Sequence, residues 1–138
     1  MTLLLRMVAG SRLYGTARPD SDYDWYEIHD QGKPFHQVSE TGDITRWPLS
    51  MFMRVADKGG HNALDLMFAP RGWPEVDLLA DLRLSYFANP ANCAHRFPKT
   101  VESMLARGDE KGKMHAQRLS ENLEDILKTG RYNPRWRI

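Results

Sequence analysis

Hydrophobic and polar positions follow two different periods along the chain, and the change between them falls near residue 48. Before it, residues 3–9 form a nearly continuous apolar run, while residues 22–29 and 43–47 divide into two alternating faces. A short apolar run bounded by turn residues is typical of a buried strand, and two-residue alternation is typical of a strand with one covered face. The first part of the chain therefore predicts a small β-sheet.

A helical period follows Pro48, which suits the first position of a helix. Apolar residues then recur three and four positions apart until Gly59 and Gly60, and Asn62 is a candidate cap for a short helix that follows. Further helices are predicted over residues 76–87, 98–107 and 110–127. Strands followed by helices predict an α+β fold with a helical C-terminal half.

The last predicted helix carries two neighbouring stripes at helical spacing. One stripe is apolar, and its members are Leu119, Leu123, Ile126 and Leu127. The other is polar, and its members are His115, Arg118 and Asn122. The apolar stripe is expected to face the core.

Composition narrows the class of protein. The chain has 138 residues, of which 41% are hydrophobic and 27% charged, so one domain with an ordinary core is expected. Apolar runs are too short for a membrane span or a secretory signal, which favours a cytoplasmic protein with no membrane partner. The single Cys93 excludes an internal disulfide and fits a reducing compartment. The net charge of +1 favours no class of partner.

Residues 10–24 carry the strongest chemical signal. A Gly10–Ser11 turn follows the first predicted strand, and Asp22 and Asp24 stand two positions apart on the second. Alternate strand residues share a face about 6.6–6.8 Å apart, so two carboxylates there can converge on Mg²⁺. A glycine turn lets backbone N–H groups approach phosphate. This combination points to phosphoryl or nucleotidyl transfer.

The same pattern resembles the DNA polymerase β-like nucleotidyltransferase superfamily. The match is carried by Gly10-Ser11 and Asp22-Tyr23-Asp24, with Gly15 and residues 18–21 between them. A narrower similarity is to predicted nucleotidyltransferases of bacteria and phages that are grouped with an RNA-repair-pathway enzyme. Residues 62–68, 113–119 and 127–132 carry that narrower similarity.

The resemblance implies a fold and a metal site. It implies a nucleotidyltransferase core with a small mixed sheet over residues 1–70 and a helical region over residues 71–138 packed on that core. It also implies a nucleoside triphosphate with two Mg²⁺ or Mn²⁺ ions, held by Asp22, Asp24 and a third carboxylate. Asp43 is the expected third ligand, and Glu40 and Asp65 are the alternatives.

Further residues are expected at the nucleotide. Gly10 and Ser11 would hold the terminal phosphates, and Arg12 would add a bidentate phosphate contact. His115 and Arg118 either face the cleft or form an ordinary helix surface. The implied reaction transfers a nucleoside monophosphate from a nucleoside triphosphate to a hydroxyl of an RNA end, a protein or a small molecule.

Two other functions stay open. One is a nucleotide-binding module without transfer chemistry, since the third carboxylate is uncertain. The other is an RNA-binding adaptor that uses the basic C-terminal residues Arg131, Arg135 and Arg137. For this basic segment, a tail that packs back on the domain is the favoured interpretation.

Overall fold

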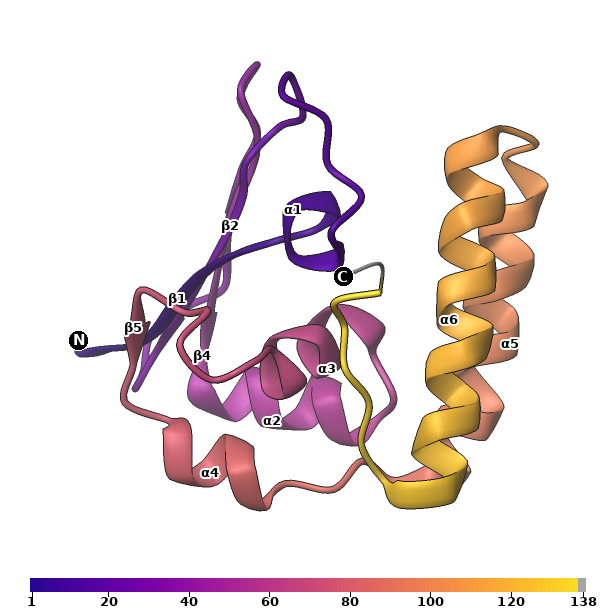
Figure 1. The fold of residues 1–138 in the computed structure, drawn as a ribbon. Helices are drawn as coiled ribbons and strands as arrows, with labels where there is room; N and C mark the ends of the chain where they lie inside the picture. Colours follow the sequence, from indigo (N-terminus) through magenta and orange to yellow (C-terminus); the bar gives the residue numbers. More distant parts are fainter. Residues whose placement is uncertain (137–138) are drawn as a thin grey trace.

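The structure is a computed structural model that describes residues 1–136. Within these residues, five strands form one sheet and six helices lie around it, which confirms the predicted α+β fold (Figure 1). The predicted residue Arg137 lies outside the described range. No helix among residues 1–136 combines the length and the apolar character needed to cross a membrane.

The sheet is mixed and has the strand order β3-β4-β2-β1-β5. Its strands are β1 (Leu3–Ala9), β2 (Asp24–His29), β3 (Phe35–Gln37), β4 (Ile44–Pro48) and β5 (Val76–Asp77). β2 and β4 are parallel, and the other neighbours are antiparallel. β3 was not predicted. β5 corrects the helix expected over residues 76–87, and it brings a strand from beyond residue 70 into the sheet.

The helices are α1 (Ser11–Tyr14), α2 (Leu49–Asp57), α3 (His61–Phe68), α4 (Ala80–Ser85), α5 (Pro90–Ala106) and α6 (Glu110–Thr129). The predicted start of α5 at Pro98 is wrong, because the helix begins at Pro90, where Asn89 accepts a hydrogen bond from the Asn92 amide. Pro98 lies inside the helix, where it costs one backbone hydrogen bond. α3 begins at His61, with Gly60 rather than Asn62 before it.

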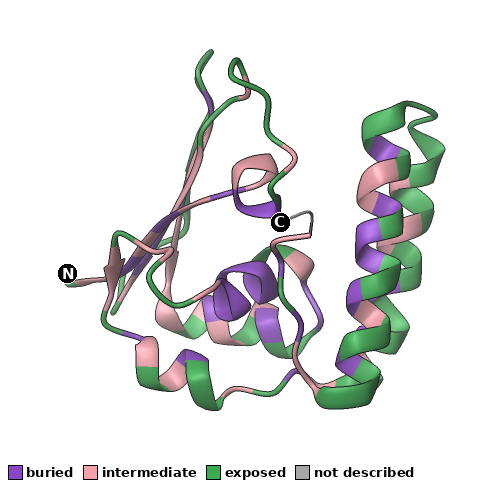
Figure 2. Ribbon diagram, viewed as in Figure 1, coloured by how far each residue is buried: buried purple, intermediate pink, exposed green. Residues whose placement is uncertain are grey.

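The hydrophobic core lies between β1, β2, α2 and α3. Its fully buried side chains include Leu5 and Met7 of β1, Ile28 of β2, Phe52 of α2 and Leu64 of α3. α5 and α6 form a helical hairpin beside this core, and the buried positions of α6 lie on the side turned toward it (Figures 1 and 2).

The core-facing side of α6 differs from the predicted apolar stripe. Leu119 and Ile126 are buried as expected, but Leu127 is exposed. Arg118 and Asn122 of the neighbouring polar stripe are buried instead. Long polar side chains therefore reach into the interior, where they need hydrogen-bond partners.

After α6, the chain turns at Gly130 and runs back toward α1 (Figure 1). Gly130 has a φ of 81°, and its carbonyl accepts from the Ala88 amide at 2.9 Å. Arg131 donates to the carbonyls of Arg83 and Tyr86 at 2.8 and 2.7 Å. The favoured interpretation of a tail packed on the domain is confirmed for residues 131–136.

Candidate functional site

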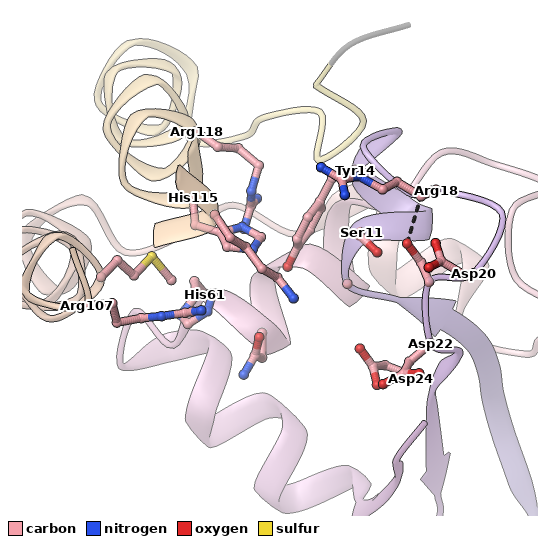
Figure 3. Close-up of a pocket in the computed structure, with 15 residues that line it drawn as sticks. Ser11, Tyr14, Arg18, Asp20, Asp22, Asp24, His61, Arg107, His115 and Arg118 are labelled. Carbon is pink, nitrogen blue, oxygen red and sulfur yellow. Dashed lines mark hydrogen bonds between the residues drawn. The ribbon is translucent and has the colours of Figure 1, made fainter. Parts of the chain in front are cut away.

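A cavity of about 540 Å³ lies between the residues that follow β1 and the helical hairpin (Figure 3). Gly10, Ser11, Asp22 and Asp24 line one side, so the structure brings the two predicted motifs together. The opposite side is lined by Arg107, Lys111, His115 and Arg118 of the hairpin. The cavity therefore has an acidic wall from the sheet and a basic wall from the helices.

Asp24 occupies its place on the acidic wall because β2 starts opposite the end of β1. Ala9 pairs with Asp24, so Gly10 follows directly beside the Asp24 carboxylate. Gly10 has a φ of 64°, and a Cβ atom there would stand 2.8 Å from Asp24 Oδ2. Glycine is thus required both by the backbone conformation and by this close approach.

Asp22 reaches the cavity in a different way from the one predicted. β2 begins at Asp24, so Asp22 lies in the loop just before the strand, and its carboxylate still lies beside that of Asp24 (Figure 3). Asp20, from the same loop, also lines the cavity. Among residues 1–136, none of these three carboxylates forms an ion pair. Their oxygens are the kind of ligand that hard cations such as Mg²⁺ prefer.

Asp43 lies next to Asp24 but outside the main cavity. The parallel pairing of β2 and β4 sets it there, and its amide is 3.4 Å from Asp24 Oδ1. Its carboxylate lies 3.3 Å from His36 Nε2 and lines a smaller cavity of about 160 Å³, which Asp24 also borders. The described part of the chain contains no cluster of three or more His, Cys, Asp or Glu side chains able to hold a metal.

The two alternative third carboxylates lie elsewhere. Glu40 is exposed in the loop between β3 and β4. Asp65 is buried in α3, where its carboxylate accepts from the hydroxyls of Tyr14 and Tyr132 at 2.7 and 2.5 Å. Arg118 completes this cluster with an ion pair to Asp65 of 3.3 Å. Asp65 is therefore occupied by protein partners.

The Asp65 cluster holds the basic wall in place. The Arg118 guanidinium stacks on the Tyr14 ring, 3.6 Å from its centroid. Burial raises the pKa of the Tyr14 and Tyr132 hydroxyls well above their ordinary value, so both stay protonated as donors to Asp65. Arg118 therefore borders the cavity as a fixed, buried cation rather than as a mobile surface side chain.

His115 borders the cavity as a neutral side chain. Burial lowers its pKa to about 4, and the positive charges of Arg118 and Lys111 add to this effect. Its ring meets the Tyr14 ring edge-on, with 5.7 Å between the centroids. At neutral pH the imidazole can therefore both donate and accept a hydrogen bond.

Arg12 is the predicted phosphate ligand that does not reach the cavity. Its Nη2 donates to the Ser21 carbonyl at 2.6 Å, and its guanidinium stacks on the Tyr23 ring at 3.7 Å. These contacts connect α1 to the loop that carries Asp20 and Asp22. Arg12 thus helps to hold the loop of the acidic wall without lining the cavity itself.

Several lining residues were not predicted. His61 and Asn62 line the cavity from the start of α3, Arg107 from the end of α5 and Lys111 from the start of α6. Burial lowers the pKa of His61, which favours its neutral form. Residues 62–68 carry part of the narrower resemblance, and this was the sequence signal that could have pointed to the start of α3. The sequence held no local signal for Arg107.

A second cavity, of about 610 Å³, continues from the first along α6. The two cavities share Ser11, Arg18, Ser21, Lys111 and His115. The second cavity adds Lys113 and Gln117 from α6 and Thr16 from the loop after α1. Because they share lining residues, the two cavities form one continuous cleft.

No family model matches the sequence, and a search of curated proteins finds no significant similarity. What the chain does must therefore be inferred from the cleft, whose acidic wall fits a hard cation and whose basic wall fits an anion.

Proposed function

We propose that the chain is a Mg²⁺-dependent nucleotidyltransferase that transfers a nucleoside monophosphate to a hydroxyl acceptor. The observation that carries this proposal is the division of charge in one cleft. Asp22 and Asp24 stand beside the Gly10–Ser11 turn, and cations line the opposite side. A nucleoside triphosphate bound to Mg²⁺ presents a metal and several phosphates together, which is the ligand that such a pair of walls suits.

In this proposal each wall has a distinct role. Asp22 and Asp24 would hold the ion, which when bound would stabilise charge on the leaving pyrophosphate. Ser11 and Arg18 would bind phosphate oxygens from the side of the aspartates, and Lys111 would neutralise the phosphates from the opposite side. Asp43 would join the ligands only if its contact with His36 were replaced.

The second cavity is the proposed acceptor side. It adjoins the first cavity and carries Lys113 and Gln117 but none of the three aspartates. His115 borders both cavities, so its neutral imidazole is available to accept a hydrogen bond from an acceptor hydroxyl. The acceptor is either an RNA end, a protein hydroxyl or a small molecule.

The test is transfer from labelled nucleoside triphosphates to a panel of these acceptors with Mg²⁺ or Mn²⁺. We expect a double Asp22→Asn and Asp24→Asn variant to lose activity by at least about 100-fold, because both metal ligands are lost. Asp125→Asn is the matched control, since Asp125 is exposed on α6 away from the cleft. Activity that persists in the double variant would overturn the metal site.

A nucleotide-binding module without transfer is the second candidate. The place of Asp43 favours it, because this expected third ligand lies outside the main cavity and next to His36. In that case calorimetry would detect nucleotide binding that depends on Asp22 and Asp24. The nucleoside triphosphate would then release no pyrophosphate with any acceptor of the panel.

A further inference from the structure

The short helix α1, which directly follows the Gly10–Ser11 turn, depends on a distant segment for its hydrogen bonds. Inside α1, the Tyr14 amide donates to the Gly10 carbonyl at 3.0 Å, and the Gly15 amide donates to the Ser11 carbonyl at 3.1 Å. A helix of four residues is too short to be stable by itself. The carbonyls of its last turn therefore need partners from elsewhere.

Residues 131–136 supply those partners. The Arg135 guanidinium donates through Nη1 to the Leu13 carbonyl at 3.1 Å and to the Arg12 carbonyl at 3.3 Å. The Trp136 amide donates to the Tyr14 carbonyl at 2.9 Å. Three consecutive carbonyls of α1 thus bind this one segment.

The same segment is fixed on its other sides. Arg135 stacks over the Trp73 ring at 4.5 Å, and the Trp73 indole donates to the Val8 carbonyl of β1 at 2.9 Å. Tyr132 is buried and bound to Asp65. The segment is therefore held by the sheet and by α3 while it holds α1.

We propose that residues 132–136 form a clamp, and that Arg135 is a positioning residue that keeps the Gly10–Ser11 turn in its nucleotide-binding position. This inference rests on the proposed function. Arg135 would touch no substrate, because it contacts α1 from the side of Leu13, away from the residues that line the cavity. It acts through the backbone of α1, which carries Ser11 at its start.

The chain offers a matched control in Arg131. Arg131 also belongs to the segment, also donates to backbone carbonyls and also stacks on an aromatic ring, that of Phe68. Its carbonyl partners belong to Arg83, Leu84 and Tyr86, at the end of α4, rather than to α1. Arg131→Ala therefore removes a similar set of contacts without releasing the turn.

The experiment compares Arg135→Ala, Arg135→Lys and Arg131→Ala in the full chain. Calorimetry measures the Kd for a non-hydrolysable ATP analogue with Mg²⁺, and hydrogen exchange measures protection of the amides of Tyr14, Gly15 and Thr16. We expect Arg135→Ala to raise Kd roughly five- to tenfold and to speed exchange at these amides. Arg131→Ala should change Kd less than about twofold. Arg135→Lys should restore part of the binding, because lysine can still donate to one carbonyl.

The outcomes separate this inference from the proposed function. If the unaltered protein binds no nucleotide, the proposed function fails, and the exchange measurement still tests the clamp. If it binds nucleotide and the two alanine variants behave alike, the positioning role of Arg135 is overturned. Unchanged exchange at residues 14–16 in Arg135→Ala overturns the clamp itself. Thermal unfolding of each variant shows whether a loss of binding comes from unfolding instead. If Arg135→Ala is unfolded, Arg135→Lys replaces it in the test, and an unchanged Kd and unchanged exchange in that folded variant would overturn the positioning role.

Discussion

Replacing Asp65 by asparagine tests the cluster that holds the basic wall. The side chains of Asp65 and Arg118 are 1% and 2% exposed, and Asp65 also accepts from the hydroxyls of Tyr14 and Tyr132. Asparagine keeps the size of the side chain but removes its charge. The guanidinium of Arg118 is then buried without a counter-charge.

The expected loss follows from this burial. Breaking a buried pair by removing one partner costs about 3–5 kcal/mol. At about 2–4 °C per kcal/mol for a chain of this size, the melting temperature should fall by roughly 6–20 °C. Because the total stability of a domain is about 5–15 kcal/mol, the variant should still fold at low temperature.

Urea unfolding without added metal, followed by circular dichroism, is the appropriate assay. Asp125→Asn, on the exposed side of α6, serves as the control and should change stability by less than about 0.5 kcal/mol. Adding Arg118→Met to Asp65→Asn should recover part of the loss, since the unpaired buried charge is then gone. A loss below about 1 kcal/mol in Asp65→Asn would refute the role of this pair.

Two further predictions concern the cleft. Gly10→Ala should lower stability and nucleotide affinity more than Gly72→Ala, because both glycines have positive φ but only Gly10 lies against a carboxylate, that of Asp24. Calorimetry measures the nucleotide affinity of both variants, and urea unfolding measures their stability. Equal effects in the two variants would contradict the close approach between residue 10 and the Asp24 carboxylate. The pKa of His115 is lowered to about 4 from 6.5, so the unfolded chain binds more protons between these values and stability falls as pH decreases from 6.5 to 4. His115→Gln should lose less stability over that interval in urea titrations; an identical pH dependence would contradict it.

The sequence predicted those elements whose structure follows from residues that are neighbours along the chain. The apolar run of β1, the glycine turn after it and the long period of α6 each follow from neighbouring residues. The same holds for α2, although the helix begins at Leu49 and Pro48 is its N-cap rather than its first residue. Gly10, Ser11, Asp22 and Asp24 were therefore predicted from the sequence as site residues, and the structure brings them to one cavity. Their role at a nucleotide stays a prediction.

Elements that depend on distant partners were missed. β3 has three exposed residues and β5 has two residues, so neither carries enough alternation to be detected. The burial of Arg118 follows from its pairing with Asp65, 53 positions away, which no helical period encodes. Arg12 was expected at the phosphates but stacks on the Tyr23 ring instead. The sequence does not show this contact, because only the fold brings the two side chains together.

The clamp on α1 also has a consequence for the order in which the site is completed during synthesis. Arg12 and Arg135 are 123 positions apart, so the ribosome makes the turn long before it makes the segment that supports it. Until residues 135 and 136 have left the ribosome, three carbonyls of α1 lack the donors that bind them in the folded protein. Contacts between such distant segments form late in folding. A nascent chain should therefore carry the motif before the clamp supports it, and under the proposed function it should bind nucleotide more weakly until the clamp has closed.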